Sequence, residues 1–205
     1  MSRLALPWFD PTPPTAEQCV IPRLIDRHAA NTPDKVFVRF ETGETWTWAQ
    51  TRDRARATAA ALQARGVAKG DIVAAWAPNS AALMQAWFGA NYAGAALAPI
   101  NTSFRGHLLE HAIAKCQARL LIIHPDLVER LEGLSLGQVE RLILTGDAAT
   151  AVDLTLPVEP ASALQGDASA YVEVVSQPWD TPVIIFTSGT LSLIHISEPT
   201  RLRRI

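Results

Sequence analysis

Residues 72–100 read IVAAWAPNSAALMQAWFGANYAGAALAPI, and this stretch decides the fold class. Two short apolar runs, Ile72-Val-Ala-Ala-Trp76 and Ala95-Ala-Leu-Ala-Pro-Ile100, flank a segment of helical character. Neither run alternates polar with apolar residues. Continuous apolar runs are typical of strands in a parallel sheet that helices cover on both faces. The stretch therefore predicts two parallel strands joined by a helix.

Three further apolar runs follow the same pattern: Leu120–Ile123, Leu142–Leu144 and Val183–Phe186. We therefore predict an α/β fold with a partial, doubly wound and mainly parallel sheet that carries helices on both faces. The helix predicted over residues 80–93 is apolar nearly all round, so we expect it to be buried. Residues 145–181 hold scattered glycines and prolines and predict a surface excursion before the last strand.

The N-terminal region carries two helix-start signals. Thr15-Ala-Glu-Gln18 and Thr47-Trp-Ala-Gln50 both have the hydroxyl-to-glutamine spacing of a capping box, which predicts that a helix begins at each. We expect the second helix to end near Arg65 and to pack through one face. Between the two signals, Val36–Phe40 and Thr45–Thr47 flank a glycine-containing loop and predict a hairpin at an edge.

Composition excludes several classes of protein. The 205 residues are 48% hydrophobic and 19% charged, with 18 Lys and Arg against 20 Asp and Glu, which argues against a disordered chain and against a nucleic-acid or anionic-membrane partner. Cys19 and Cys116 form no CxxC pair, which is typical of a reducing compartment. No apolar stretch resembles a signal peptide or reaches the ~20 uninterrupted residues of a membrane span. We therefore expect a cytoplasmic protein.

The candidate binding site directly follows the last apolar run. Thr187-Ser-Gly-Thr190 combines three hydroxyls with a glycine at the end of a predicted strand. Backbone amides and hydroxyls in such a loop can converge on one anion, and glycine permits close approach of the backbone to a phosphate. The four residues alone leave an ordinary Ser/Thr/Gly turn open as the alternative.

Four segments along the chain together resemble one enzyme family. They are residues 45–50 (TWTWAQ), 69–80 (KGDIVAAWAPNS), 86–101 (AWFGANYAGAALAPIN) and 180–190 (DTPVIIFTSGT). In this order and spacing they are similar to the adenylate-forming, or AMP-binding, superfamily, which includes acyl-CoA synthetases, luciferases and the adenylation domains of peptide synthetases. The resemblance covers about residues 16–190. It implies that residues 1–190 are the incomplete N-terminal part of an AMP-binding domain.

The resemblance also implies a reaction. Family members use ATP to convert a small-molecule carboxylic acid to an acyl-adenylate, and an acyl-CoA ligase then transfers the acyl group to coenzyme A, with Mg2+ accompanying ATP. It assigns Thr187, Ser188, Gly189 and Thr190 to nucleotide binding. The resemblance implies that the parent enzyme is an acyl-CoA ligase. The family's acyl pocket and catalytic lysine lie beyond this stretch, so we expect this chain itself to be inactive. A non-catalytic binding fragment is the alternative.

The sequence departs from the family after Thr190. Members continue with Thr-Gly-x-Pro-Lys-Gly, whereas residues 191–205 read LSLIHISEPTRLRRI and contain neither glycine nor lysine. This ending resembles translated sequencing-adapter sequence. We therefore predict that residues 191–205 are a non-native tail, with a native variant tail as the alternative.

A second motif points to different chemistry. His107-Leu-Leu-Glu-His111 spells H-x-x-E-H, in which two histidines one helical turn apart hold zinc and the glutamate acts as a base. Glu129, Glu132 and Glu140 are candidates for a third ligand. This alternative, a zinc metallopeptidase, competes with an ordinary solvated helix over residues 106–115.

Overall fold

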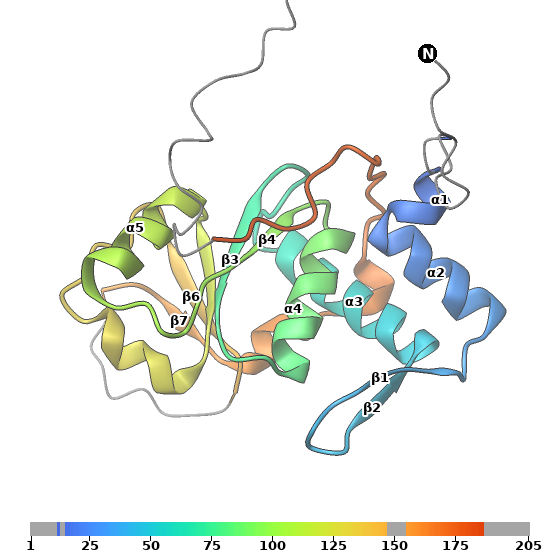
Figure 1. Cartoon of the computed structure of the whole chain (residues 1–205), viewed down its shortest axis with the longest axis horizontal. Helices are drawn as coiled ribbons and strands as arrows, with labels where there is room; N and C mark the ends of the chain where they lie inside the picture. Colours follow the sequence, from blue (N-terminus) through green and yellow to red (C-terminus); the bar gives the residue numbers. More distant parts are fainter. Residues whose placement is uncertain (1–11, 13–14, 147–154, 187–205) are drawn as a thin grey trace, which may run out of the picture.

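The structure, a computed structural model, describes residue 12, residues 15–146 and residues 155–186 (Figure 1). In chain order the helices and strands are α1 (Ala16–Cys19), α2 (Ile21–Asn31), β1 (Val36–Arg39), β2 (Thr45–Thr47), α3 (Trp48–Gln63), β3 (Ile72–Trp76), α4 (Ala81–Tyr92), β4 (Ala96–Pro99), α5 (Gly106–Cys116), β5 (Leu120–Ile123), β6 (Arg141–Leu144) and β7 (Val158–Glu159). Three short 3₁₀ helices cover Pro125–Leu131, Ala161–Leu164 and Ala168–Ala170.

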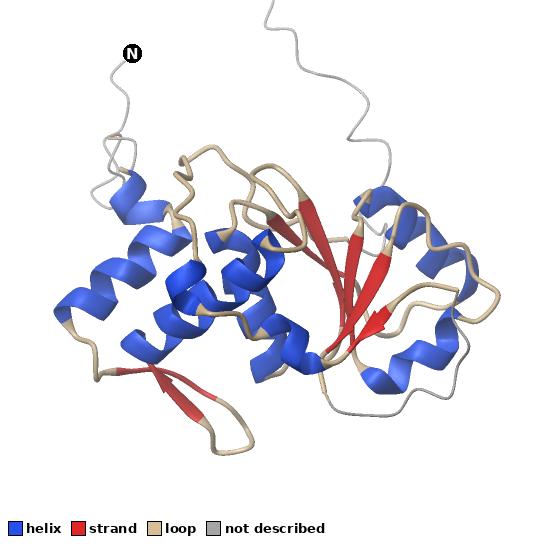
Figure 2. Ribbon diagram, turned by 180° about the vertical axis from the view of Figure 1, so that it is seen from behind, coloured by secondary structure: helices blue, strands red, loops and turns tan. Residues whose placement is uncertain are grey.

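A five-stranded parallel sheet forms the centre of the molecule. Its strand order is β4-β3-β5-β6-β7, and every neighbouring pair is parallel (Figure 2). The order reverses between β3 and β5, which is the arrangement of a doubly wound sheet. The predicted α/β class is confirmed, and β3, β4, β5 and β6 lie where the apolar runs place them.

Helices cover both faces of this sheet, as predicted. Val73 and Ala75 of β3 point toward α3 and α4, where Leu62 and Ala90 belong to the same buried cluster. Trp76, on the opposite face, belongs to a cluster formed with α5 and the 3₁₀ helix Pro125–Leu131. Because both faces are buried, the strands need apolar side chains at consecutive positions, which explains why their sequence does not alternate.

Two predictions about the sheet are wrong. Val183–Phe186 does not form a strand: it makes one parallel bridge, between Val183 and Leu97. The fifth strand is β7, at the opposite edge and inside the stretch that we expected to be a surface excursion. The apolar run falls short because it lies at the outer edge of β4, paired on one side, with Ile185 68% exposed. A two-residue strand such as β7 is too short to show a periodic pattern.

Both predicted capping boxes begin helices. Thr47 N donates to Gln50 Oε1 (2.9 Å) and Gln50 N donates to Thr47 Oγ1 (3.3 Å), which starts α3. Thr15 N donates to Gln18 Oε1 (2.8 Å) at the start of α1. The hairpin between them is also confirmed, but β1 and β2 form a separate two-stranded antiparallel sheet and are not an edge of the parallel one.

Helix α3 is more buried than predicted. It ends at Gln63, and its second half packs through more than one face, because the 3₁₀ helices Ala161–Leu164 and Ala168–Ala170 cross over it. The Thr58 hydroxyl donates to Leu164 O (2.9 Å) and accepts from Gln85 Nε2 (2.8 Å). The polar contacts at Thr58 therefore join α3 to both α4 and the later chain. Helix α4 is itself buried mainly in its second half, whereas its first turns are half-buried.

No helix within the described ranges has the length and apolar character needed to cross a lipid bilayer.

Candidate functional site

The predicted phosphate loop, Thr187–Thr190, lies outside the described residues, so the described part of the site is the segment that leads to it. Residues 171–182, here called the return segment, carry the chain from the 3₁₀ helix Ala168–Ala170 back to the edge at β4. In Figure 1 this orange and red segment runs past α3 and α4 toward β4. Its contacts decide where the chain arrives at residue 186.

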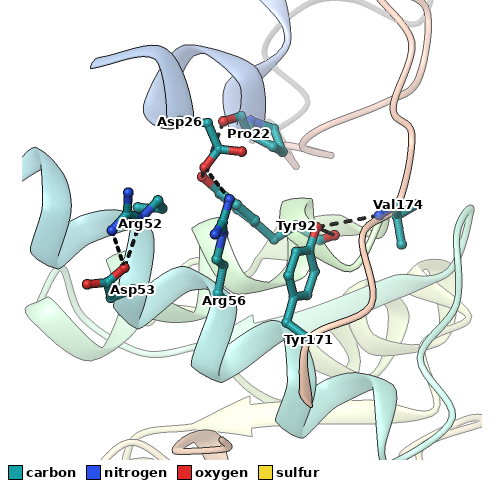
Figure 3. Close-up of polar contacts among 8 residues, drawn as sticks. All are labelled: Pro22, Asp26, Arg52, Asp53, Arg56, Tyr92, Tyr171 and Val174. Atoms are coloured by element: carbon teal, nitrogen blue, oxygen red, sulfur yellow. Dashed lines mark hydrogen bonds and ion pairs between the residues drawn. The ribbon is translucent and has the colours of Figure 1, made fainter. Parts of the chain in front are cut away.

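The beginning of the return segment is fixed to α3 and α4. Gln63 Nε2 donates to Val172 O (2.8 Å) and Val172 N donates back to Gln63 Oε1 (3.1 Å). The Tyr171 hydroxyl donates to Tyr92 O (3.2 Å) and accepts from Val174 N at 3.4 Å (Figure 3). These side-chain contacts replace the sheet hydrogen bonds that this extended segment lacks.

The middle of the return segment is held by Lys69, which precedes β3. Its Nζ donates to Val175 O (2.9 Å) and lies 2.7 Å from Asp180 Oδ2. The same carboxylate oxygen accepts from Gln177 N at 2.8 Å. The hydrogen bond from Lys69, followed by that from Gln177 N, lowers the pKa of the Asp180 carboxyl. Asp180 is therefore ionised at neutral pH and closes the turn over residues 177–180.

The end of the return segment is held by Asn91, near the C-terminus of α4. Asn91 is 4% exposed, and its Nδ2 donates to both Ala95 O (3.1 Å) and Pro182 O (2.8 Å). Leu97 N also donates to Pro182 O (3.2 Å), and Ile184 N donates to Leu97 O (2.9 Å). The Asn91 side chain thus connects the turn before β4 to Pro182, the residue that precedes the bridge at Val183.

This anchoring directs the chain to the carboxyl end of the sheet. Val183 runs parallel to Leu97, and the side chains of Ile184 and Phe186 pack against the cluster on the α5 face. In open parallel sheets, ligands bind outside the carboxyl ends of the strands. The described chain therefore ends at the carboxyl end of the sheet, beside the edge strand β4.

The zinc motif lies on α5, which is helical as expected. His107 Nδ1 is 2.9 Å from Glu110 Oε2, and Glu110 Oε1 accepts from Ser135 N (2.8 Å). The Ser135 amide, and then His107, lower the pKa of the Glu110 carboxyl. Across residues 15–146 and 155–186, no three His, Cys, Asp or Glu side chains gather as metal ligands, and Glu129, Glu132 and Glu140 do not complete this pair. Glu110 instead joins α5 to the loop at Ser135.

A polar cluster that no sequence pattern reveals joins the first helices; Tyr92 is buried, whereas Asp26 and Arg56 are half-buried. The Tyr92 hydroxyl donates to Asp26 Oδ1 (2.8 Å), and Arg56 Nη2 lies 3.1 Å from the same oxygen (Figure 3). Burial, followed by the charge of Asp26, raises the pKa of Tyr92 well above its usual range. The partners are 66 and 30 residues apart in sequence, so no local pattern predicts their contact. They join α2, α3 and α4 beneath the return segment.

Comparison with known proteins places the chain in a family. The sequence profile described as "AMP-binding enzyme" matches residues 25–192, which is most of the chain. The chain belongs to the AMP-binding enzyme family. The resemblance inferred from the sequence motifs is thereby confirmed.

Individual relatives cover the same region. The medium/long-chain-fatty-acid–CoA ligase FadD6 of Mycobacterium tuberculosis is 33% identical over 178 residues, or 85% of this chain and 28% of that protein. The probable acyl-activating enzyme 21 of Arabidopsis thaliana is 38% identical over 49% of this chain and 19% of its own length. This AMP-binding chain thus spans less than a third of the length of these curated relatives.

Solved structures agree on the fold. A putative long-chain-fatty-acid CoA ligase from Rhodopseudomonas palustris matches 83% of this chain and 42% of its own, with a TM-score of 0.72 and 24% sequence identity. A long-chain-fatty-acid-CoA ligase from Archaeoglobus fulgidus matches 87% of this chain and 36% of its own, with a TM-score of 0.69 and 21% identity. At these identities the likeness concerns the arrangement of helices and strands.

Proposed function

We propose that this chain is the N-terminal part of an ATP-dependent, AMP-forming acyl-CoA ligase. The observation that carries the proposal is the family match over residues 25–192, together with a return segment that brings the chain to the carboxyl end of the parallel sheet. Thr187, Ser188, Gly189 and Thr190 follow directly and would contact the phosphates of ATP through hydroxyls and backbone amides.

The proposed reaction has two steps. A carboxylate oxygen of the acid attacks the α-phosphorus of ATP, the bond to the bridging oxygen breaks, and pyrophosphate leaves with that electron pair. The thiol of coenzyme A then loses its proton and its sulfur attacks the acyl carbon, and the bond to AMP breaks. A hydroxyl and amide loop favours the first step by holding the phosphates in line and stabilising their charge.

The proposal also covers the acid substrate and the metal ion of this reaction. The relatives named as fatty-acid–CoA ligases favour an aliphatic carboxylic acid as the substrate. Mg2+ would accompany ATP and reduce phosphate repulsion. The described residues provide no cluster of three carboxylates, histidines or cysteines for it, so no step is assigned to the metal through them.

The proposal is tested on the protein encoded by the uninterrupted reading frame that contains residues 1–190. We expect ATP–pyrophosphate exchange that depends on an added fatty acid, measured over chain lengths from acetate to palmitate. Thr187→Ala combined with Ser188→Ala lowers the exchange rate at least about tenfold, because the lost donors face developing charge. Thr42→Ala, in the loop between β1 and β2, is the matched control and leaves the rate unchanged. No exchange with any carboxylate contradicts the proposal.

For the 205-residue chain by itself we expect no enzymatic activity. We propose that it is an inactive part of the enzyme and that residues 191–205 are a non-native tail, which is consistent with a family match that ends at residue 192. The chain alone is expected to show no pyrophosphate exchange. ATP binding by calorimetry without exchange favours the binding-fragment alternative. Exchange by the chain alone contradicts the assignment, and an intact gene that encodes the same ending contradicts the non-native tail.

A further inference from the structure

Two of the segments that resemble the AMP-binding family have a common physical role in the structure. Residues 69–80 contribute Lys69, and residues 86–101 contribute Asn91 and Gly94. The side chains of Lys69 and Asn91 donate hydrogen bonds to the return segment, and the main chain at Gly94 lies close to it. They are not close in sequence to the predicted phosphate loop, and none of them is assigned to nucleotide binding.

We propose that Lys69 and Asn91 are positioning residues for the phosphate loop, acting through the return segment. The inference rests on the proposed function, because it assigns the loop to ATP. Lys69 fixes Val175 and Asp180, and Asn91 fixes Pro182 five residues before Thr187. A segment without a full strand ladder depends on such side chains for its position, and an ångström of misplacement is costly in a catalytic site.

The chemistry of Asn91 makes this role specific. Both N–H bonds of its side-chain amide meet carbonyl oxygens, Ala95 O and Pro182 O, which fixes the orientation of the amide. A carboxylate of the same shape would place negative charge against two carbonyl oxygens. Asn91→Asp therefore reverses the interaction without changing the volume, whereas Asn91→Leu removes it.

Gly94 permits the close approach of the segment. It has φ +77°, and a Cβ at this position would lie 2.7 Å from Val174 Cγ1 and 3.1 Å from Lys69 Cβ. The return segment thus crosses the turn before β4 at a place where the side chains of Val174 and Lys69 leave no room for a Cβ at Gly94. Two features therefore favour glycine at position 94: the positive φ of the turn and the close approach of Val174.

The experiment compares Asn91→Asp, Asn91→Leu and Lys69→Met with Lys69→Arg and with a control. Lys69→Arg retains the pair with Asp180 and is the conservative rescue. Lys115→Met on α5, which packs on the other face of the sheet, is the matched control. The variants are made in the protein of the uninterrupted reading frame and, in parallel, in the 205-residue chain.

Two readouts are measured. Hydrogen exchange of the peptides covering residues 176–184 reports anchoring without any nucleotide, and we expect at least about tenfold faster exchange for the three disruptive variants. In pyrophosphate exchange, the KM for ATP rises about fivefold or more while the KM for the fatty acid stays within about twofold, because only the phosphate loop is displaced. Lys69→Arg and Lys115→Met change neither quantity.

Each failure has a distinct meaning. Unchanged hydrogen exchange contradicts the anchoring by Lys69 and Asn91. Faster hydrogen exchange with an unchanged KM for ATP contradicts the positioning role. Faster hydrogen exchange with an equal rise in the KM values for ATP and for the fatty acid contradicts it too. If the unmutated complete protein performs no pyrophosphate exchange, the proposed function and the ATP part of this inference both fail, and the hydrogen-exchange result still decides the anchoring.

Discussion

At the scale of single residues, Lys69 and Asn91 lie in segments that resemble the AMP-binding family and contact residues far away in the sequence. Asn91 and Pro182 are 91 residues apart, and Lys69 and Val175 are 106 residues apart. A motif read along the sequence marks such residues without showing what they touch. The structure indicates that several of them hold another part of the chain in place.

The first prediction concerns Gly94. We expect Gly94→Ala to lower the free energy of unfolding by about 2 kcal/mol or more, because alanine disfavours the left-handed backbone and its Cβ would clash with Val174. Gly70→Ala is the control, because Gly70 has φ +90° but nothing within 4 Å of the added Cβ. Urea denaturation of both variants separates backbone strain from crowding. Equal losses for the two would show that the return segment does not press on Gly94.

The second prediction concerns the two cysteines. Burial raises the pKa of the Cys116 thiol to about 11, so the thiolate is scarce at pH 8. Cys19 is half-buried, at the C-terminal end of α1. Iodoacetamide at pH 8 is therefore expected to alkylate Cys19 in the folded chain and to leave Cys116 unmodified, as read by mass spectrometry of peptides. Both must react in urea, and equal rates without urea would contradict the buried position of Cys116.

At the scale of elements, charged side chains attach the short strand β7 to its surroundings. Glu159 Oε2 accepts from Arg65 Nη2 (2.6 Å) and Glu159 Oε1 from Arg141 Nη1 (3.0 Å). The two pairs attach a two-residue strand to Arg65, two residues beyond the end of α3, and to β6. Hydrogen bonding to Arg65 is the largest contribution that lowers the pKa of Glu159.

The third prediction follows from this carboxylate. A lowered folded pKa means that the stabilisation is present above the unfolded value near 4.3 and is lost as the pH falls through the folded value. Glu159→Gln is expected to lower the free energy of unfolding by about 1 kcal/mol at pH 7, since the pairs are only partly buried.

The measurement is urea denaturation of both proteins at several pH values, with Glu41→Gln in the exposed loop of the hairpin as control. The difference between the wild type and Glu159→Gln must shrink below about pH 4. A difference that is constant from pH 7 to pH 3 would show that charge does not hold β7.

The sequence predicts those elements whose signals are local. Ile72–Trp76 and Leu120–Ile123 are long enough, and apolar enough, to indicate buried strands, and the Thr47 capping box places the start of α3. Val183–Phe186 looks the same by composition, but pairing depends on the neighbours that the sheet edge offers. For the site, the sequence reaches Thr187–Thr190 by motif alone, and that prediction remains untested. It could not supply the contacts of Asn91, because they depend on the tertiary fold.

At the scale of the whole molecule, exposed apolar side chains gather on one part of the chain. Seven large hydrophobic residues are exposed among those described, and four of them lie on residues 172–185: Val172, Val175, Trp179 and Ile185. Trp179 is 79% exposed. Together with an edge of β4 that has one bridge, this surface favours self-association.

The fourth prediction is therefore that the isolated 205-residue chain is poorly soluble and associates as its concentration rises. Trp179→Ser combined with Ile185→Ser is expected to increase the monomeric fraction severalfold in sedimentation velocity, because it removes apolar surface without touching an anchor. Leu108→Ser on α5, which is also exposed, is the control and gives a smaller gain. A chain that is monomeric at all concentrations contradicts the prediction.

The long-range anchors of the return segment also bear on how the protein is made. Residues up to 144 hold four of the five strands, so a growing polypeptide can pair most of its sheet while later codons are still being translated. Residues 171–182 are synthesised after Gln63, Lys69 and Asn91, the three residues to which they attach. Closing such long loops late costs little additional entropy once the surface to which they attach exists. Synthesis from the N-terminus thus builds the support before the part that it must carry.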